Sequence, residues 1–147
     1  MKLFLLRHGK DEGDRLTKEG REQIHDLAGR MQLIIVGSVL IYTSLLRRAV
    51  ESAEIIANVL AIEDTPEKLD FLGKGDGQTP PGPLLYEALL TLNGKADFIV
   101  CVTHTWGMID IVLHLDHQGD WSFPNFRRPE QGEALLLNFD TKTGIVI

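Results

Sequence analysis

The chain has 147 residues, of which 44% are hydrophobic and 24% are charged. This size and composition are typical of a globular domain, so we expect one domain over residues 1–147. The net charge of −6 argues against nonspecific binding to nucleic acid or to an anionic membrane, although a few clustered cations can still hold an anion. The absence of a long apolar run or a signal-peptide pattern, with Cys101 as the only cysteine, predicts a cytoplasmic location.

Apolar runs rich in β-branched and aromatic residues predict the strands. They cover residues 2–7, 39–43 and 98–103, and a terminal pair covers 133–139 and 144–147. Because parallel strands are covered on both faces, the lack of clean apolar–polar alternation indicates a mostly parallel sheet.

Apolar residues at helical spacing predict four helices between these strands. We expect Thr17 and Ser44 to be the N-caps of the first two, and residues 73–83, rich in glycine and proline, to form a loop. The helices cover residues 17–31, 49–60, 84–92 and 106–115. Alternating strands and helices predict an α/β fold, a three-layer α/β/α sandwich.

Three predicted strands are followed by histidine or arginine residues. Arg7 and His8 end the first strand, Arg47 and Arg48 follow the second, and His104 follows the third. Ligands of open α/β sheets bind beyond the carboxyl ends of the strands, where these residues would meet. Guanidinium groups suit phosphate oxygens, and a neutral imidazole can attack phosphorus. Each residue alone also fits a surface or structural role.

Four segments resemble motifs of the histidine phosphatase superfamily, also called phosphoglycerate-mutase-like. Residues 6–9 (LRHG) match its signature, and residues 16–23 resemble its LTxxGxxQ pattern. Residues 44–53 resemble its SPLxRAxQTA segment, with Leu45 in place of the usual proline, and residues 102–107 resemble the VSHGG segment of its second histidine. The resemblance therefore implies a phosphoglycerate-mutase-like fold.

The resemblance also implies a mechanism in which His8 becomes phosphohistidine and water then releases phosphate. Arg7, Arg48 and His104 would hold the phosphoryl oxygens, since the motif register selects Arg48 and not Arg47. No metal or other cofactor is implied.

Residues 72–77 (LGKGDG) can be aligned with the family's FGxWEG loop, which puts Asp76 where the proton donor usually lies. Aspartate replaces the longer glutamate, and Gly75 replaces the tryptophan. Asp76 is equally consistent with a turn residue among glycines.

Residues 54–97 leave no room for a lid domain. In this respect the chain resembles the small phosphohistidine phosphatases of the SixA type. We therefore expect a phosphatase that acts on phosphomonoesters or protein phosphohistidine, with a phosphorylated small molecule or a phosphoprotein as its partner. A mutase-type phosphotransferase and a non-catalytic phosphate-binding regulatory module are the alternatives. Asp11, Glu12 and Asp14 do not have EF-hand spacing. Arg127 and Arg128 could line the mouth of the site, but they fit a surface pair better.

Overall fold

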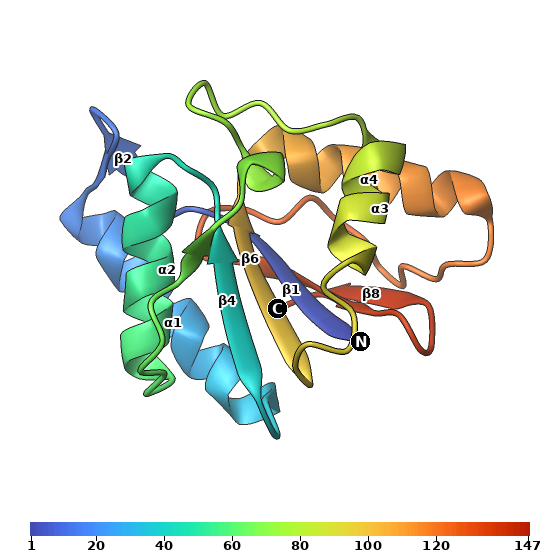
Figure 1. The fold of residues 1–147 in the computed structure, drawn as a ribbon, viewed down its shortest axis with the longest axis horizontal. Coiled ribbons are helices and arrows are strands. Elements are labelled where there is room, and N and C mark those ends of the chain that lie inside the picture. Colours follow the sequence, from blue (N-terminus) through green and yellow to red (C-terminus); the bar gives the residue numbers. More distant parts are fainter.

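A six-stranded sheet lies at the centre of the computed structural model, which describes residues 1–147 (Figure 1). The strand order is β5-β4-β6-β1-β7-β8. The first four strands in this order are parallel, and β7 and β8 are antiparallel to their neighbours. The strands are β1 (Lys2–Arg7), β4 (Val39–Thr43), β5 (Glu67–Lys68), β6 (Phe98–Thr103), β7 (Ala134–Asn138) and β8 (Thr143–Val146). The predicted mostly parallel sheet is confirmed.

Helices cover both faces of the sheet. One face packs on α1 (Lys18–Ile34) and α2 (Arg47–Val59), and the other packs on α3 (Gly82–Leu90) and α4 (Thr105–Gln118) (Figure 1). Successive residues of β1 serve both cores, because strand side chains alternate between faces. Phe4 and Leu6 lie in the first core, and Leu3 and Leu5 lie in the second. The three-layer α/β/α sandwich is therefore confirmed.

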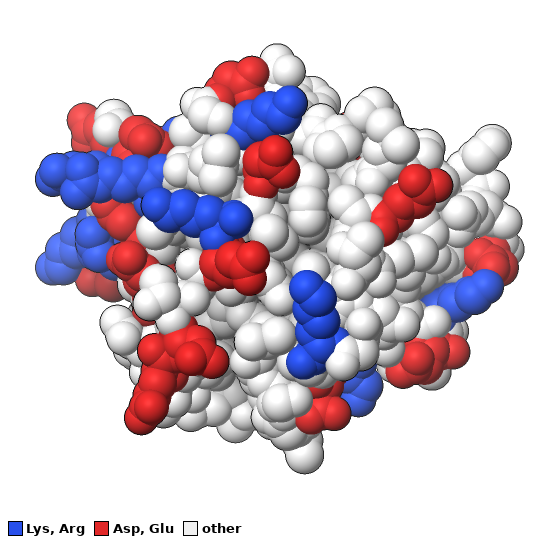
Figure 2. All heavy atoms as spheres, in the orientation of Figure 1, with Lys and Arg blue, Asp and Glu red and all other residues white.

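Charge is distributed unevenly over the helical layers. Figure 2 shows basic and acidic side chains gathered over α1 and α2, and mostly uncharged atoms over α3 and α4. None of the helices combines the length and apolarity that crossing a membrane requires.

Several predicted boundaries differ from the observed ones. Thr17 caps α1 as expected, since its Oγ1 accepts a hydrogen bond from Gly20 N at 3.0 Å. Ser44 does not cap α2, whose N-cap is Leu46 and has no side-chain hydrogen bond. The α4 helix is longer than predicted at both ends. It extends to Gln118 because Gly119, in the left-handed conformation with φ 76°, forms its C-cap.

Three short structures were not predicted, and one of them is the edge strand β5. Residues 11–16 form a hairpin of β2 (Asp11–Glu12) and β3 (Arg15–Leu16), and Asp14 in its turn has a φ of 66°. A 3₁₀-helix, η1 (Asp70–Leu72), precedes the glycine-rich loop. Strands of two residues are too short to produce a periodic pattern, so only tertiary packing reveals them.

The backbone after β1 packs closely against the first turn of α1. A Cβ atom on Gly9 would lie 2.5 Å from the carbonyl oxygen of Gly20, and one on Gly20 would overlap the carbonyl oxygen of Lys10. Thr17 N also donates to Lys10 O at 2.9 Å. Two glycines thus allow a backbone-to-backbone contact that fixes the segment next to His8.

We expect Gly20→Ala to lower the free energy of unfolding by about 1–3 kcal/mol, because the backbone of Lys10 must move to admit the methyl group. For a domain of this size, the melting temperature falls by roughly 2–4 °C per kcal/mol. The matched control is Gly29→Ala in the same helix, where a Cβ atom has no neighbour within 4 Å. That change should stabilise the protein by about 0.5–1 kcal/mol. Equal shifts for the two variants in thermal unfolding would contradict the steric argument.

Candidate active site

His8 follows the last residue of β1 and is 4% exposed. Its Nδ1 lies 2.9 Å from the carbonyl oxygen of Gly9. A carbonyl oxygen only accepts, so Nδ1 carries the proton and Nε2 carries the lone pair. Arg48 Nε donates to this Nε2 at 3.1 Å, which requires the same tautomer. The backbone thus presents His8 with the nitrogen needed for nucleophilic attack unprotonated.

Arg48 lies in the first turn of α2 and is held at both ends of its guanidinium group. Its Nε contacts His8, and its Nη1 donates to Asp14 Oδ1 at 2.9 Å. Arg47 instead binds Glu51, with its Nε 3.0 Å from Oε1. Of the two arginines, only Arg48 contacts His8.

Ser52 links the backbones that carry these two side chains. Its Oγ accepts from Gly9 N at 3.1 Å and donates to the carbonyl oxygen of Arg48 at 2.8 Å. Ser52 is fully buried one helical turn after Arg48. The segment next to His8 is therefore joined to the first turn of α2.

His104 follows β6 and is the N-cap of α4. Its ring centroid lies 5.2 Å from that of His8, and its Nε2 lies 2.8 Å from Ser44 Oγ. Ser44 therefore orients the second histidine. Gly73 lies against the same ring, and a Cβ atom there would be 2.5 Å from His104 Cδ2. With a φ of 143°, Gly73 has the space and the backbone freedom that covering His104 requires.

Arg7 supplies a second guanidinium group at the end of β1. Its Nε is buried and has no hydrogen-bond partner in the protein. A buried donor without a partner costs about 1–3 kcal/mol, so an acceptor oxygen of a ligand would be favourable here. Burial lowers the pKa of Arg7, and the nearby charge of Arg128 lowers it further. Arg128 thus adds positive charge beside Arg7.

His8 and His104 are both neutral at pH 7. Burial lowers the pKa of His8, and the charges of Arg48 and Arg7 lower it further, against an opposing effect of the Gly9 hydrogen bond. Burial, then His8 and the arginines, lower the pKa of His104 to about 4. Positive charge at this site therefore comes from guanidinium groups.

The structure places the acidic residues differently from the sequence-based expectation. Asp76 is exposed, and its Oδ1 accepts from Gln78 N at 2.9 Å within its own turn, so the carboxylate has no contact with His8. Asp11 Oδ1 lies 3.6 Å from His8 Nδ1, and Asp14 binds Arg48. No three His, Cys, Asp or Glu residues form a group that could hold a metal ion.

Of the residues expected in the site, His8, Arg48 and His104 lie together, with Arg7 beside them. Asp76 lies in the loop that covers His104 and does not reach the other two. Ser44, Ser52 and Asp14 were not identified as site residues from the sequence, and Arg128 was interpreted as more consistent with a surface pair. Ser44 and Ser52 had a usable signal, because both lie within the matched motif of residues 44–53.

Comparisons with known proteins give one family match and a set of similar solved structures. Residues 3–70 match the model of a family described as histidine phosphatase superfamily (branch 1). No curated protein matches the chain.

Solved structures with the same fold include several phosphatases. The protein histidine phosphatase SixA complexed with tungstate is 21% identical, with a TM-score of 0.70 over 100% of this chain and 94% of that chain. A phosphoserine phosphatase mutant from Entamoeba histolytica in complex with phosphoserine is 19% identical, with a TM-score of 0.67 over 99% and 94%. The mycobacterial glucosyl-3-phosphoglycerate phosphatase complexed with VO3 is 18% identical, with a TM-score of 0.67 over 99% and 96%.

Residues 3–70 thus match the histidine phosphatase superfamily, and the whole chain shares the fold of the solved phosphatase structures.

Proposed function

We propose that this protein is a phosphatase that hydrolyses phosphomonoesters or protein phosphohistidine through a covalent phosphohistidine on His8. The observation that carries the proposal is the position of His8 Nε2, unprotonated and 3.1 Å from Arg48 Nε. Support also comes from the neighbouring structures, which are named as phosphatases and include complexes with tungstate and phosphoserine. The scheme uses no metal or other cofactor.

In the first step, His8 Nε2 attacks phosphorus and the bond from phosphorus to the leaving group breaks. Arg7 and Arg48 hold the phosphoryl oxygens, and His104 donates a further hydrogen bond. A phosphoryl oxygen would accept the N–H that Arg48 directs at His8 Nε2, which frees the lone pair for attack. The hydrogen bond from Nδ1 to Gly9 stabilises the positive charge that develops on the imidazole ring.

In the second step, water attacks the phosphorus of phosphohistidine. The bond from phosphorus to Nε2 breaks, inorganic phosphate leaves, and His8 returns to its neutral tautomer. The arginines hold the same oxygens in both steps, so one electrostatic clamp serves both transition states.

Replacement of the nucleophile tests this mechanism. We expect His8→Ala to lower kcat for an aryl phosphate by at least about 10³-fold, because the covalent pathway is lost. Mass spectrometry of alkaline digests after brief exposure to the substrate should show a phosphoryl group on His8 of the wild type. The control is His25→Ala, since His25 is exposed on α1. Full activity of His8→Ala would refute the proposed nucleophile.

The lowered pKa values predict how the histidines titrate. Between pH 8 and 5.5, NMR signals of the His104 ring should not shift, and the His8 midpoint should lie below 6.5. In urea both should titrate near 6.5, the ordinary value for histidine.

The unfolded chain then binds more protons than the folded protein between about pH 6.5 and 4. The free energy of unfolding should therefore fall as the pH falls through this range, and His104→Gln should weaken that dependence. A His104 midpoint near 6.5 in the folded protein would contradict the effect of burial.

We propose Asp76 as the proton donor, which requires its loop to turn toward the leaving group. Asp76→Asn should then lower kcat for alkyl phosphates by about 10²–10⁴-fold, because an alkoxide needs a proton as it leaves. Aryl phosphates and phosphohistidine, whose leaving groups need less help, should be affected much less. Asp14→Asn is the matched variant, since Asp14 lies nearer to the reacting groups. Loss of alkyl phosphate turnover in Asp14→Asn alone would assign the acid to Asp14.

A further inference from the structure

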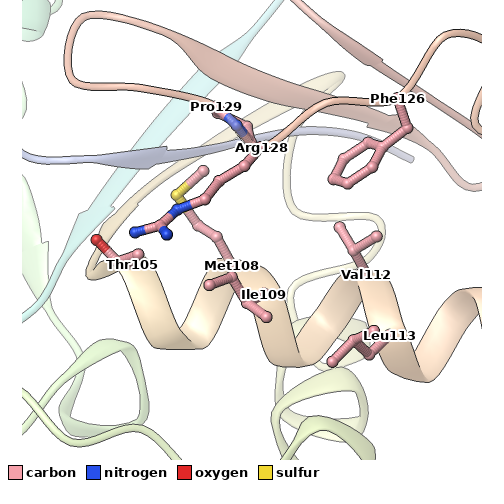
Figure 3. Close-up of a pocket in the computed structure, with 8 residues that line it drawn as sticks. All are labelled: Thr105, Met108, Ile109, Val112, Leu113, Phe126, Arg128 and Pro129. Atoms are coloured by element: carbon pink, nitrogen blue, oxygen red, sulfur yellow. The ribbon is translucent and has the colours of Figure 1, made fainter.

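A groove runs along α4 from the candidate active site. It is lined on one side by residues of α4 and on the other by the segment after it, and it encloses a cavity of about 240 Å³ (Figure 3). The lining residues are Thr105, Met108, Ile109, Val112, Leu113, Phe126, Arg128 and Pro129. This volume lies below the range of about 300–1,000 Å³ for drug-sized ligands, so the groove suits one alkyl chain or one aromatic ring.

One end of the groove lies beside two candidate phosphate-binding residues, His104 and Arg7. Thr105 directly follows His104, and Arg128 lines both the groove and a second cavity that Arg7 lines. Figure 3 shows the Arg128 side chain extending over the first turn of α4 toward Thr105. A group covalently attached to a phosphate at His8 would therefore be directed along α4.

The charges change along the groove. Arg127 binds Glu133 with both guanidinium nitrogens, whereas Arg128 has no carboxylate partner in the structure. Beyond Arg128 the lining is apolar, with Phe126 facing Val112 across the groove (Figure 3). The groove is thus cationic where it meets the phosphate site and apolar farther away, which matches an anionic head attached to an apolar tail.

We propose that this groove binds the apolar alcohol part of a phosphomonoester substrate, which makes alkyl or aryl phosphates the preferred class. The inference rests on the phosphatase function proposed above. From Thr105 to Ile109 the helix rises about 6 Å, and from Thr105 to Leu113 about 12 Å. Longer chains would therefore contact Ile109 first and Leu113 later.

A series of n-alkyl phosphates from ethyl to octyl tests this proposal below the concentrations at which the esters aggregate. The alkoxide leaving groups are chemically alike, so changes in kcat/KM report contacts of the chain. Each buried methylene should raise kcat/KM by up to about fourfold, mainly through KM.

Substitutions of groove residues show which part of the groove contacts the alkyl chain. Ile109→Gln should flatten the dependence on chain length from butyl onward, and Leu113→Gln should flatten it only for the longest esters. Leu113 is 62% exposed, so its replacement leaves the core intact. Leu33→Gln is the matched control, because Leu33 is 88% exposed on α1, and it should keep the wild-type dependence.

A flat kcat/KM from ethyl to octyl phosphate would overturn the inference. If the groove variants instead impaired only the turnover of a phosphohistidine-bearing protein, the groove would belong to a protein partner, which also overturns it. In either case His8→Ala would still abolish turnover. Failure of the proposed function would give a different result from failure of the groove inference, because His8→Ala would then remain active on every ester.

Discussion

The hydrogen bond from His8 Nδ1 to the carbonyl oxygen of Gly9 decides which ring nitrogen can react. It keeps the proton on Nδ1 and directs the lone pair of Nε2 toward Arg48. This bond depends on the position of the Gly9 backbone, which is fixed by close contact with Gly20 and by Ser52. Since Ser52 also binds the backbone of Arg48, His8 and Arg48 are positioned by one connected set of hydrogen bonds.

Burial and positive charge act on the imidazoles in the same direction. Both disfavour the protonated form, so the His8 ring stays neutral beside the positive charges of Arg7 and Arg48. The arginines in turn need acidic neighbours when they are close together. Asp14 and Asp11 near Arg48 provide this balance, in a protein whose overall charge is negative. The electrostatic potential at the site is therefore set by these neighbouring side chains and not by the net charge of the protein.

The sequence was sufficient for the parts of the fold that depend on local pattern. Three strands, 2–7, 39–43 and 98–103, were predicted with the observed bounds, because fully buried strands are continuous apolar runs. The residues at the carboxyl ends of these parallel strands therefore lie close together, as expected. Asp14 was not predicted and Arg128 was interpreted as a surface residue, because a hairpin of two-residue strands and an irregular segment are placed by tertiary contacts. Ser44 was misinterpreted as a helix cap, since the geometry that directs its hydroxyl to His104 depends on β4 and β6 lying side by side.

The position of β1 has a consequence for biosynthesis. Although β1 precedes the other strands in the chain, it lies between β6 and β7, whose residues begin at positions 98 and 134. During translation β1 has neither neighbour until most of the chain has left the ribosome, and its apolar edges stay open to wrong pairing. His8 is therefore synthesised well before its neighbour His104. A nascent chain cannot bring these two rings together before β6 and residue 104 have been made.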